Sequence, residues 1–274
     1  MALTINTNTE AASASRFLAI TQGRLGRGLE QLASGRRINR GADDAAGLAV
    51  SEGISAQVRG LSQVVRNAQD GVSVVQIADG ALSQTSVALQ RVRELTVQAG
   101  NGTLSAEQRG IIQAEIDALQ GSIDQFAGGA QFNSQPLLDG STPTVTLQMG
   151  ANAANTQSFD LPDATAAGLG VGPGTVDVST RASANASLVA IDAAIDAVNS
   201  QRVTLGGAQN ALEAVVGTLN VAIENLHASE SRIRDLDVGQ AVARNARDQI
   251  LGQIGAAVQA QANVSRESVL RLLG

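Results

Sequence analysis

The sequence of 274 residues contains no cysteine, tryptophan, tyrosine or lysine, and only four phenylalanines. Because cysteine is absent, disulfide bridges and thiolate metal sites are excluded. Aromatic side chains are the usual bulky fillers of a compact globular core, yet they make up only 1% of this chain. Combined with an ordinary apolar content of 43%, this scarcity favours long helices packed side by side over a compact globule.

The charged and titratable residues disfavour several functional classes. The formal net charge is −6, and no basic cluster is large enough for a phosphate-binding stripe, which argues against nucleic acid as a partner. The only histidine, His227, cannot build a zinc site that requires two histidines at helical spacing. Asp43 and Asp44 could act as paired carboxylates, but we interpret them as the start of a helix. We therefore predict no catalytic, metal-binding or cofactor-binding residues, no cofactor and no enzymatic activity.

The chain also lacks long apolar runs. None approaches the roughly 18 residues of a membrane-spanning helix, so we expect a soluble protein without a membrane partner. The first residues form neither a basic region nor a continuous apolar region, and we expect no cleaved secretory signal. If the protein is exported, we expect a route that removes no segment.

What is present is a seven-residue repeat that dominates residues 43–98. Apolar residues recur there at alternating spacings of four and three, which is typical of a coiled-coil seam on a helix. Asp79 and Ser86 are the polar exceptions, and we interpret them as residues that set the register. The predicted core residues of this helix are Ile54, Val58, Leu61, Val65, Val72, Val75, Leu82 and Leu89.

Two further segments have the same spacing. One is predicted to start at Ser105, where Gln108 completes a capping-box pattern, and the short turn before it makes it an antiparallel neighbour of the first helix. The other is the longest seam, with Arg202 and Gln209 as its polar members. The predicted core residues of these two helices are Ile112, Ile116, Leu119, Leu188, Ile191, Ile195, Val198, Leu205, Leu212, Val216, Leu219, Ile223 and Leu226.

Both ends of the chain have weaker helical patterns. Glycines such as Gly23 and Gly252 interrupt them, and each interior glycine costs about 1 kcal/mol relative to alanine. We predict that both ends are disordered in the monomer and fold only on assembly, because each apolar stripe is too short to offset the entropy of ordering. The residues expected to mediate this assembly are Leu18, Leu25, Leu29, Leu32, Ile250, Ile254, Val258, Leu270 and Leu273.

Residues 127–181 differ in composition, since they hold all four prolines and many glycines. Val145, Leu147 and Met149 alternate with polar residues, as do Phe159 and Leu161, which predicts a hairpin of two short strands. The glycine-rich residues 168–174 lack the lysine of a phosphate-binding loop and indicate an ordinary loop. We expect this segment to be irregular and surface-exposed.

These patterns predict a mainly α fold. Its frame is a long antiparallel helical bundle or coiled-coil rod built from both chain ends, with a small irregular tip that contains a β-hairpin. The predicted segments are the N-terminal parts of an inner coiled-coil domain (1–42) and of a rod domain (43–130), a short variable tip (131–180), and the C-terminal parts of the rod domain (181–236) and of the inner domain (237–274).

Several stretches of the sequence resemble bacterial flagellins. In the first half they are LASGRRINRGADDAAGLAV (32–50), QDGVSVVQIADGALSQ (69–84), LQRVRELTVQAGNGT (89–103) and QFNSQPLLDG (131–140). In the second half they are ENLHASESRIRDLD (224–237) and QILGQIGAAVQAQANVSRESVLRLL (249–273). The chain departs from the family at Ser265 and Arg266, where members commonly carry a Pro-Gln pair, and in its short central insert.

The resemblance implies a structural subunit that polymerises into the bacterial flagellar filament and serves motility. The short insert implies a thin, relatively smooth filament. The implied partners are further copies of the chain or other flagellins, the flagellar cap and hook–filament junction proteins, an export chaperone and the flagellar type III export apparatus. The implied location is extracellular, in the filament. A hook–filament junction protein is the alternative, and the stretches ADDAAGLAV and QANVSRESVLRLL favour flagellin over it.

The resemblance also implies that the monomer is a ligand of a Toll-like innate immune receptor. The residues that match the recognition site of the family are Leu89, Gln90, Arg91, Leu95 and Glu115. The alternative for Arg91, at the outermost heptad position, is a solvated residue that pairs with Glu94 one helical turn away.

Overall fold

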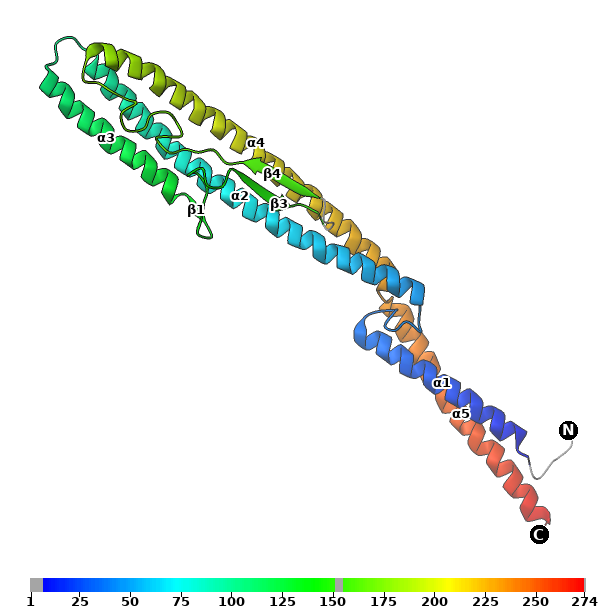
Figure 1. Ribbon diagram of the computed structural model, residues 1–274. Coiled ribbons are helices and arrows are strands. Elements are labelled where there is room, and N and C mark those ends of the chain that lie inside the picture. The colour runs from blue at the N-terminus through cyan, green and yellow to red at the C-terminus, as the bar shows by residue number, and fades with distance from the viewer. Residues whose placement is uncertain (1–6, 151–154, 274) are drawn as a thin grey trace. The chain divides into compact units, whose positions relative to one another are not determined.

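The computed structural model describes residues 7–150 and 155–273, with side chains described as far as residue 264 (Figure 1). The chain divides into two compact units. The terminal unit comprises Met1–Ala56 and Asn225–Gly274, and the central unit comprises Gln57–Glu224. The described residues form five helices and two small antiparallel sheets, joined by turns and loops. This composition confirms the predicted mainly α fold class.

In the terminal unit, helices from the two ends of the chain lie side by side: α1 (Thr9–Ser34) and α5 (Val238–Leu273) (Figure 1). Asn8 caps α1, because its Oδ1 accepts a hydrogen bond from the backbone N–H of Ala11 at 2.9 Å. Its Nδ2 donates to the carbonyl of Ala262 on α5 at 3.2 Å. Gly35 ends α1 with φ +67°, a left-handed conformation that glycine adopts at little cost.

The central unit contains α3 (Ala106–Gly129) and the greater part of α2 (Ala45–Ala99) and of α4 (Arg181–Arg234), which run side by side (Figure 1). Two ion pairs between α2 and α4, Arg93–Asp192 and Asp79–Arg202, show that these two helices are antiparallel. The capping box predicted for α3 is confirmed: Ser105 Oγ accepts from Gln108 N–H, and Gln108 Oε1 accepts from Ser105 N–H.

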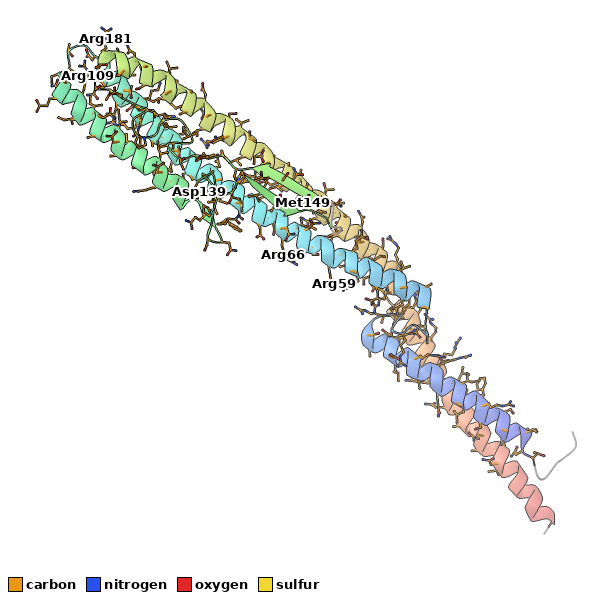
Figure 2. All side chains as sticks on the ribbon, in the orientation of Figure 1. Arg59, Arg66, Arg109, Asp139, Met149 and Arg181 are labelled. Atoms are coloured by element: carbon orange, nitrogen blue, oxygen red, sulfur yellow. The ribbon has the colours of Figure 1, made fainter. Side chains whose placement is uncertain are left out.

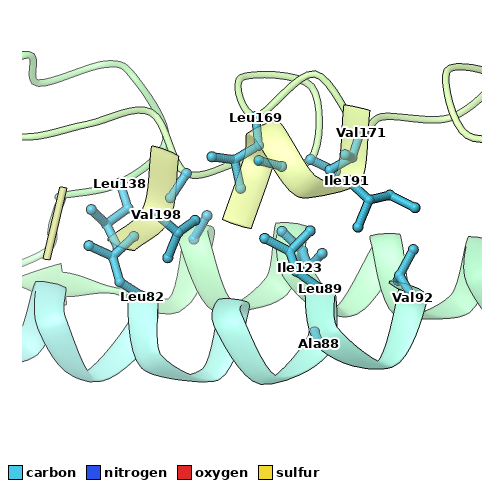
Figure 3. Packing of buried hydrophobic residues seen from close by; sticks show 14 of the residues in the cluster. Leu82, Ala88, Leu89, Val92, Ile123, Leu138, Leu169, Val171, Ile191 and Val198 are labelled. Carbon is cyan, nitrogen blue, oxygen red and sulfur yellow. The ribbon is translucent and has the colours of Figure 1, made fainter. Parts of the chain in front are cut away.

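The predicted seam residues lie on the inner sides of these helices. Those that are buried are Val58, Val75, Leu82, Leu89, Ile112, Ile116, Ile191, Val198, Leu205 and Leu212. Those that are partly buried are Ile54, Leu61, Val65, Val72, Leu119, Leu188, Ile195, Val216, Leu219, Ile223 and Leu226. The buried cluster of the central unit begins at Val74 on α2, where α3 and the segment after it add a further layer (Figure 3).

The polar members of the seam pair with each other across α2 and α4. Arg202 Nε donates to Asp79 Oδ1 at 2.8 Å, and this hydrogen bond raises the pKa of Arg202 above its ordinary value. Both side chains remain more than a third exposed, so the pair contributes little to stability. The pair instead helps to fix the register of α2 against α4, because a shifted register would separate the two charges.

The segment between α3 and α4 contains the predicted hairpin. Strand β3 (Thr144–Gln148) pairs antiparallel with β4 (Thr156–Asp160), with Val145 opposite Phe159. The hairpin packs on the flank of α2, where Asn67 Nδ2 donates to the carbonyl of Gln148 at 3.1 Å. The side chain of Leu147 approaches Gly71 so closely that a Cβ there would collide with it. The hairpin therefore lies against the side of the helices (Figure 1).

The prediction that this segment is surface-exposed is wrong for much of its length. After β4 the chain runs back over the helices, and it contributes to the core the buried residues Leu161, Ala164, Ala166, Leu169, Val171, Val176 and Val178. A smaller sheet that the sequence did not indicate precedes the hairpin, formed by β1 (Gln131–Phe132) and β2 (Gln135–Pro136). The turn between them places Asn133 and Ser134 at positive φ. The apolar residues of this loop have no regular spacing, so periodicity does not reveal their burial.

One buried side chain in the core is unsatisfied, and replacing it should stabilise the protein. Gln120 on α3 is only 2% exposed, and neither its Oε1 nor its Nε2 has a hydrogen-bond partner among the described residues. We expect Gln120→Met to raise the free energy of unfolding by about 1–3 kcal/mol, because the buried amide loses its hydration without compensation. Urea unfolding followed by circular dichroism measures this, with exposed Gln125→Met as the matched control. A lower stability of Gln120→Met would mean that a buried water satisfies the amide.

Candidate functional site

The residues that could carry chemistry are dispersed. His227 is exposed on α4, and the carboxylate nearest to it, that of Glu230, is 3.8 Å from its Nδ1. Within the described ranges, no group of three or more histidine, aspartate or glutamate side chains is placed to hold a metal ion. Asp44 Oδ1 accepts the N–H of Gly47 at 2.8 Å, which confirms its interpretation as a helix start.

None of the helices in the described part of the chain carries a stretch that is both long and apolar enough to span a lipid bilayer.

The terminal unit has an unusual distribution of apolar side chains. Of its apolar residues whose side chains the structure describes, only Ile38 and Ala241 are buried. The large apolar side chains that it exposes instead are Phe17, Ile20, Leu29, Val50, Val238, Val242, Ile250, Ile254, Val258 and Val264, with exposed fractions from 50% to 57%. All of them except Val50 lie on α1 or α5. We call these exposed apolar side chains of α1 and α5 the apolar end surface.

Backbone pairing holds α1 and α5 beside each other. The segment after α1 binds the end of α4: Arg37 N–H donates to Arg234 O at 2.7 Å, and Leu236 N–H donates to Gly35 O at 3.0 Å. The guanidinium of Arg234 also pairs with Glu52 on α2 at 2.8 Å. Because these bonds join residues far apart in sequence, they bring both chain ends into one surface.

Small residues allow the two helices to approach closely. Leu18 lies over Gly255, and a Cβ at Gly28 would collide with the side chain of Asn245. A shallow groove of about 670 Å³ remains between α1 and α5, and its lining includes Phe17, Ile254 and Val258. Packing within the unit therefore covers only part of each helix.

The structure separates the predicted assembly residues into two groups. Leu18, Leu25 and Leu32 are partly buried, whereas Leu29, Ile250, Ile254 and Val258 are more than half exposed. The side chains of Leu270 and Leu273 lie outside the described residues. The sequence reasoning missed Phe17, Ile20, Val242 and Val264, which are also exposed. Phe17 and Ile20 are one and two residues from Leu18, which places them on other faces of α1, so a search for a single stripe does not find them. Val242 and Val264 are eight and fourteen residues from Ile250, a spacing that keeps them on its stripe, so periodicity could have found these two.

The residues predicted for immune recognition are also divided. Gln90, Arg91 and Glu115 are exposed on α2 and α3, and Arg91 pairs with both Glu94 and Glu115 at 3.0 Å. Hydrogen bonds to Glu94 and then to Glu115 raise the pKa of Arg91. In contrast, Leu89 and Leu95 are 0% and 2% exposed. Including these two leucines as contact residues was wrong, because they pack in the helical core.

The comparisons with known proteins concern the whole chain. Residues 5–142 match the family model described as the bacterial flagellin N-terminal helical region, and residues 188–273 match that of the bacterial flagellin C-terminal helical region. Flagellin FlaB1 of Treponema pallidum is 42% identical over 283 residues, which cover 98% of this chain and 99% of the relative. The flagellin of Halalkalibacterium halodurans is 41% identical over 269 residues, with the same coverage of each chain.

Two solved structures are also similar. The crystal structure of Bacillus cereus flagellin is 29% identical, with a TM-score of 0.51, over 56% of this chain and 88% of that chain. A putative flagellar hook-associated protein from Vibrio parahaemolyticus has a TM-score of 0.59 over 70% of this chain and 100% of that chain. Its identity is only 16%, so this second likeness concerns the fold alone.

Proposed function

This chain belongs to the bacterial flagellin family, and from this membership we propose that it polymerises through its apolar end surface. As a flagellin, it is a structural subunit of the extracellular flagellar filament. The curated relatives that match nearly the full chain are flagellins, which decides between a flagellin and a hook–filament junction protein. We propose no enzymatic activity for it.

The observation that carries the proposal is the exposure of large apolar side chains on α1 and α5. A surface of this kind in water is typical of a protein–protein interface. We propose that the occupant is a second copy of the chain, which presents the same two helices. Contact between copies would remove Phe17, Ile254 and Val258 from water, and this burial would drive both assembly and the ordering of the ends.

Seeded polymerisation tests the proposal. We expect Ile254→Asp to raise the critical concentration for assembly by about a hundredfold, because burying an unpaired carboxylate costs several kcal/mol. The melting temperature of the monomer should not change, because we expect this segment to fold only on assembly and Ile254 is 52% exposed even in the formed helix. Ile254→Val is the matched control, and it should assemble almost normally. Normal assembly of Ile254→Asp would exclude this side chain from the interface.

The other partners that family membership suggests are part of the same proposal. They are the flagellar cap, the hook–filament junction proteins, the type III export apparatus and an export chaperone. A chaperone that bound before export would cover the apolar end surface and prevent premature assembly. Ile254→Asp should then weaken chaperone binding more than Ile254→Val does, and equal binding of the two variants would place the chaperone elsewhere.

We also propose that the monomer is recognised by an innate immune receptor through Gln90, Arg91 and Glu115. The exposure of these polar residues and the ion pair between Arg91 and Glu115 favour a preformed surface. We expect Arg91→Ala to weaken receptor activation by about tenfold or more, as for a central interface arginine, while polymerisation continues. Arg66→Ala is the control, because Arg66 is another exposed arginine of α2 (Figure 2). Equal activation by the parent and Arg91→Ala would remove Arg91 from the recognition surface.

A further inference from the structure

The turn between α2 and α3 contains the only asparagine of the chain that is followed by glycine, Asn101–Gly102. Both residues are exposed and lie outside the helices. The turn is held by a hydrogen bond from Leu104 N–H to Asn101 O at 3.4 Å. Arg109 strengthens it, since its Nε donates to Ala99 O and its Nη2 to Asn101 O, each at 2.9 Å. The backbone of this turn is therefore ordered while its side chains meet solvent.

The backbone nitrogen of Gly102 follows Asn101 directly in the chain and is not held by a hydrogen bond among the described residues. This nitrogen can therefore approach the side-chain amide of Asn101. A Cβ at Gly102 would meet nothing within 4 Å, so the surrounding space is open. Thr103 N–H donates to Asn101 Oδ1 at 3.2 Å. This oxygen gains negative charge when Cγ is attacked, so the donor stabilises the tetrahedral intermediate.

We propose that Asn101 is a site of spontaneous deamidation. The nitrogen of Gly102 loses its proton to solvent base and bonds to Cγ of Asn101. Nδ2 takes a proton back from the solvent, the bond from Cγ to Nδ2 breaks, and ammonia leaves. The resulting five-membered succinimide then takes up one water molecule at either carbonyl. Opening at one carbonyl gives aspartate, and opening at the other gives isoaspartate. The reaction consumes only water, and no oxidant or reductant takes part.

The other candidate pairs are less suited to this chemistry. Asp70–Gly71 and Asp79–Gly80 lie inside α2, where the helical backbone holds each glycine nitrogen away from the preceding side chain. Asp139–Gly140 is exposed, but Ser141 donates to Asp139 from both its hydroxyl and its N–H. These bonds lower the pKa of Asp139, and an ionised carboxylate is a poor electrophile.

The modification would change the turn in two ways. Either product adds one negative charge beside the guanidinium of Arg109. Isoaspartate also adds a methylene group to the main chain and turns the carbonyl of Asn101, which Arg109 and Leu104 bind, into a free carboxylate outside the main chain. The fraction of subunits with aspartate or isoaspartate at position 101 would therefore rise with the age of the protein.

Peptide mapping of the intact protein tests the proposal. The folded protein is held at pH 8 and 37 °C, conditions chosen to favour base-promoted attack, and then digested with trypsin. Cleavage after Arg93 and Arg109 releases residues 94–109, in which Asn101 is the only asparagine. We expect the acid form of this peptide to accumulate at least about tenfold faster than that of residues 67–91, which carry the helical Asn67.

Gly102→Ala provides the matched variant, because the structure leaves room for its methyl group. We expect it to slow the reaction by about tenfold or more while the melting temperature stays the same, since the methyl group hinders attack by the nitrogen. A methyltransferase assay specific for isoaspartate should detect the product in the parent and not in Asn101→Ser. Equal rates at Asn101 and Asn67, or no effect of Gly102→Ala, would overturn the proposal.

Discussion

Leu82→Asp should abolish the cooperative unfolding transition of the central unit. Leu82 is 0% exposed on α2, and Figure 3 shows it beside Leu138 and Val198, which come from the segment between α3 and α4 and from α4 itself. An aspartate at this position would lose the apolar contacts and bury a carboxylate without a partner. We expect a loss of more than about 4 kcal/mol, a large fraction of the stability of a typical domain.

Thermal unfolding followed by circular dichroism measures this effect. Val87→Asp is the control, because Val87 lies on the same helix, is 59% exposed, and should change stability by less than about 0.5 kcal/mol. The contrast between the two variants separates burial from the effect of an aspartate on helix formation. An unchanged midpoint for Leu82→Asp would mean that this face of α2 is not in the core.

The largest change on assembly should occur in the amide hydrogen exchange of α1 and α5. In the monomer we expect the amides of residues 18–32 and 250–258 to exchange almost as in an unfolded chain. Among the apolar residues of the terminal unit whose side chains are described, only Ile38 and Ala241 are buried. This burial is too small to offset the entropy cost of ordering the two helices without a partner. In the filament, contacts with other subunits should slow the same amides by about a thousandfold or more.

Brief trypsin treatment gives an independent measurement. Monomers should be cut first at Arg16, Arg24 and Arg27 in α1 and at Arg244 and Arg247 in α5, while the central unit survives and filaments resist. Arg93 and Arg202 are internal controls, since each pairs with a carboxylate on a facing helix of the central unit. Strong amide protection across Leu18–Leu32 in isolated monomers would contradict folding on assembly.

The segment between α3 and α4 contributes to the core, although the sequence predicted that it is exposed. Phe159 and Leu161 are 8% and 4% exposed, and Asp124 on α3 accepts the N–H of Ala166 at 2.8 Å. This segment is therefore part of the hydrophobic core of the central unit. This arrangement explains how a chain with so few aromatic residues fills the space between its long helices.

The sequence by itself determined which segments are helices and which side of each faces a partner. A seven-residue repeat acts locally, because side chains three and four residues apart share one face of a helix whatever surrounds it. For the same reason, the cap at Ser105 and the strand alternation around Val145 could be predicted. Motifs spread over both halves of the chain were enough to indicate the family.

The tertiary structure alone decided how deeply each predicted residue lies and which distant residues meet. Leu89 and Leu95 matched a recognition pattern, but only the packing of the other elements shows that they are inaccessible. The pairing of Arg91 with Glu115 and the burial of Val171 join residues from separate segments. Such contacts depend on how the chain folds back on itself, and no local period in the sequence encodes that path.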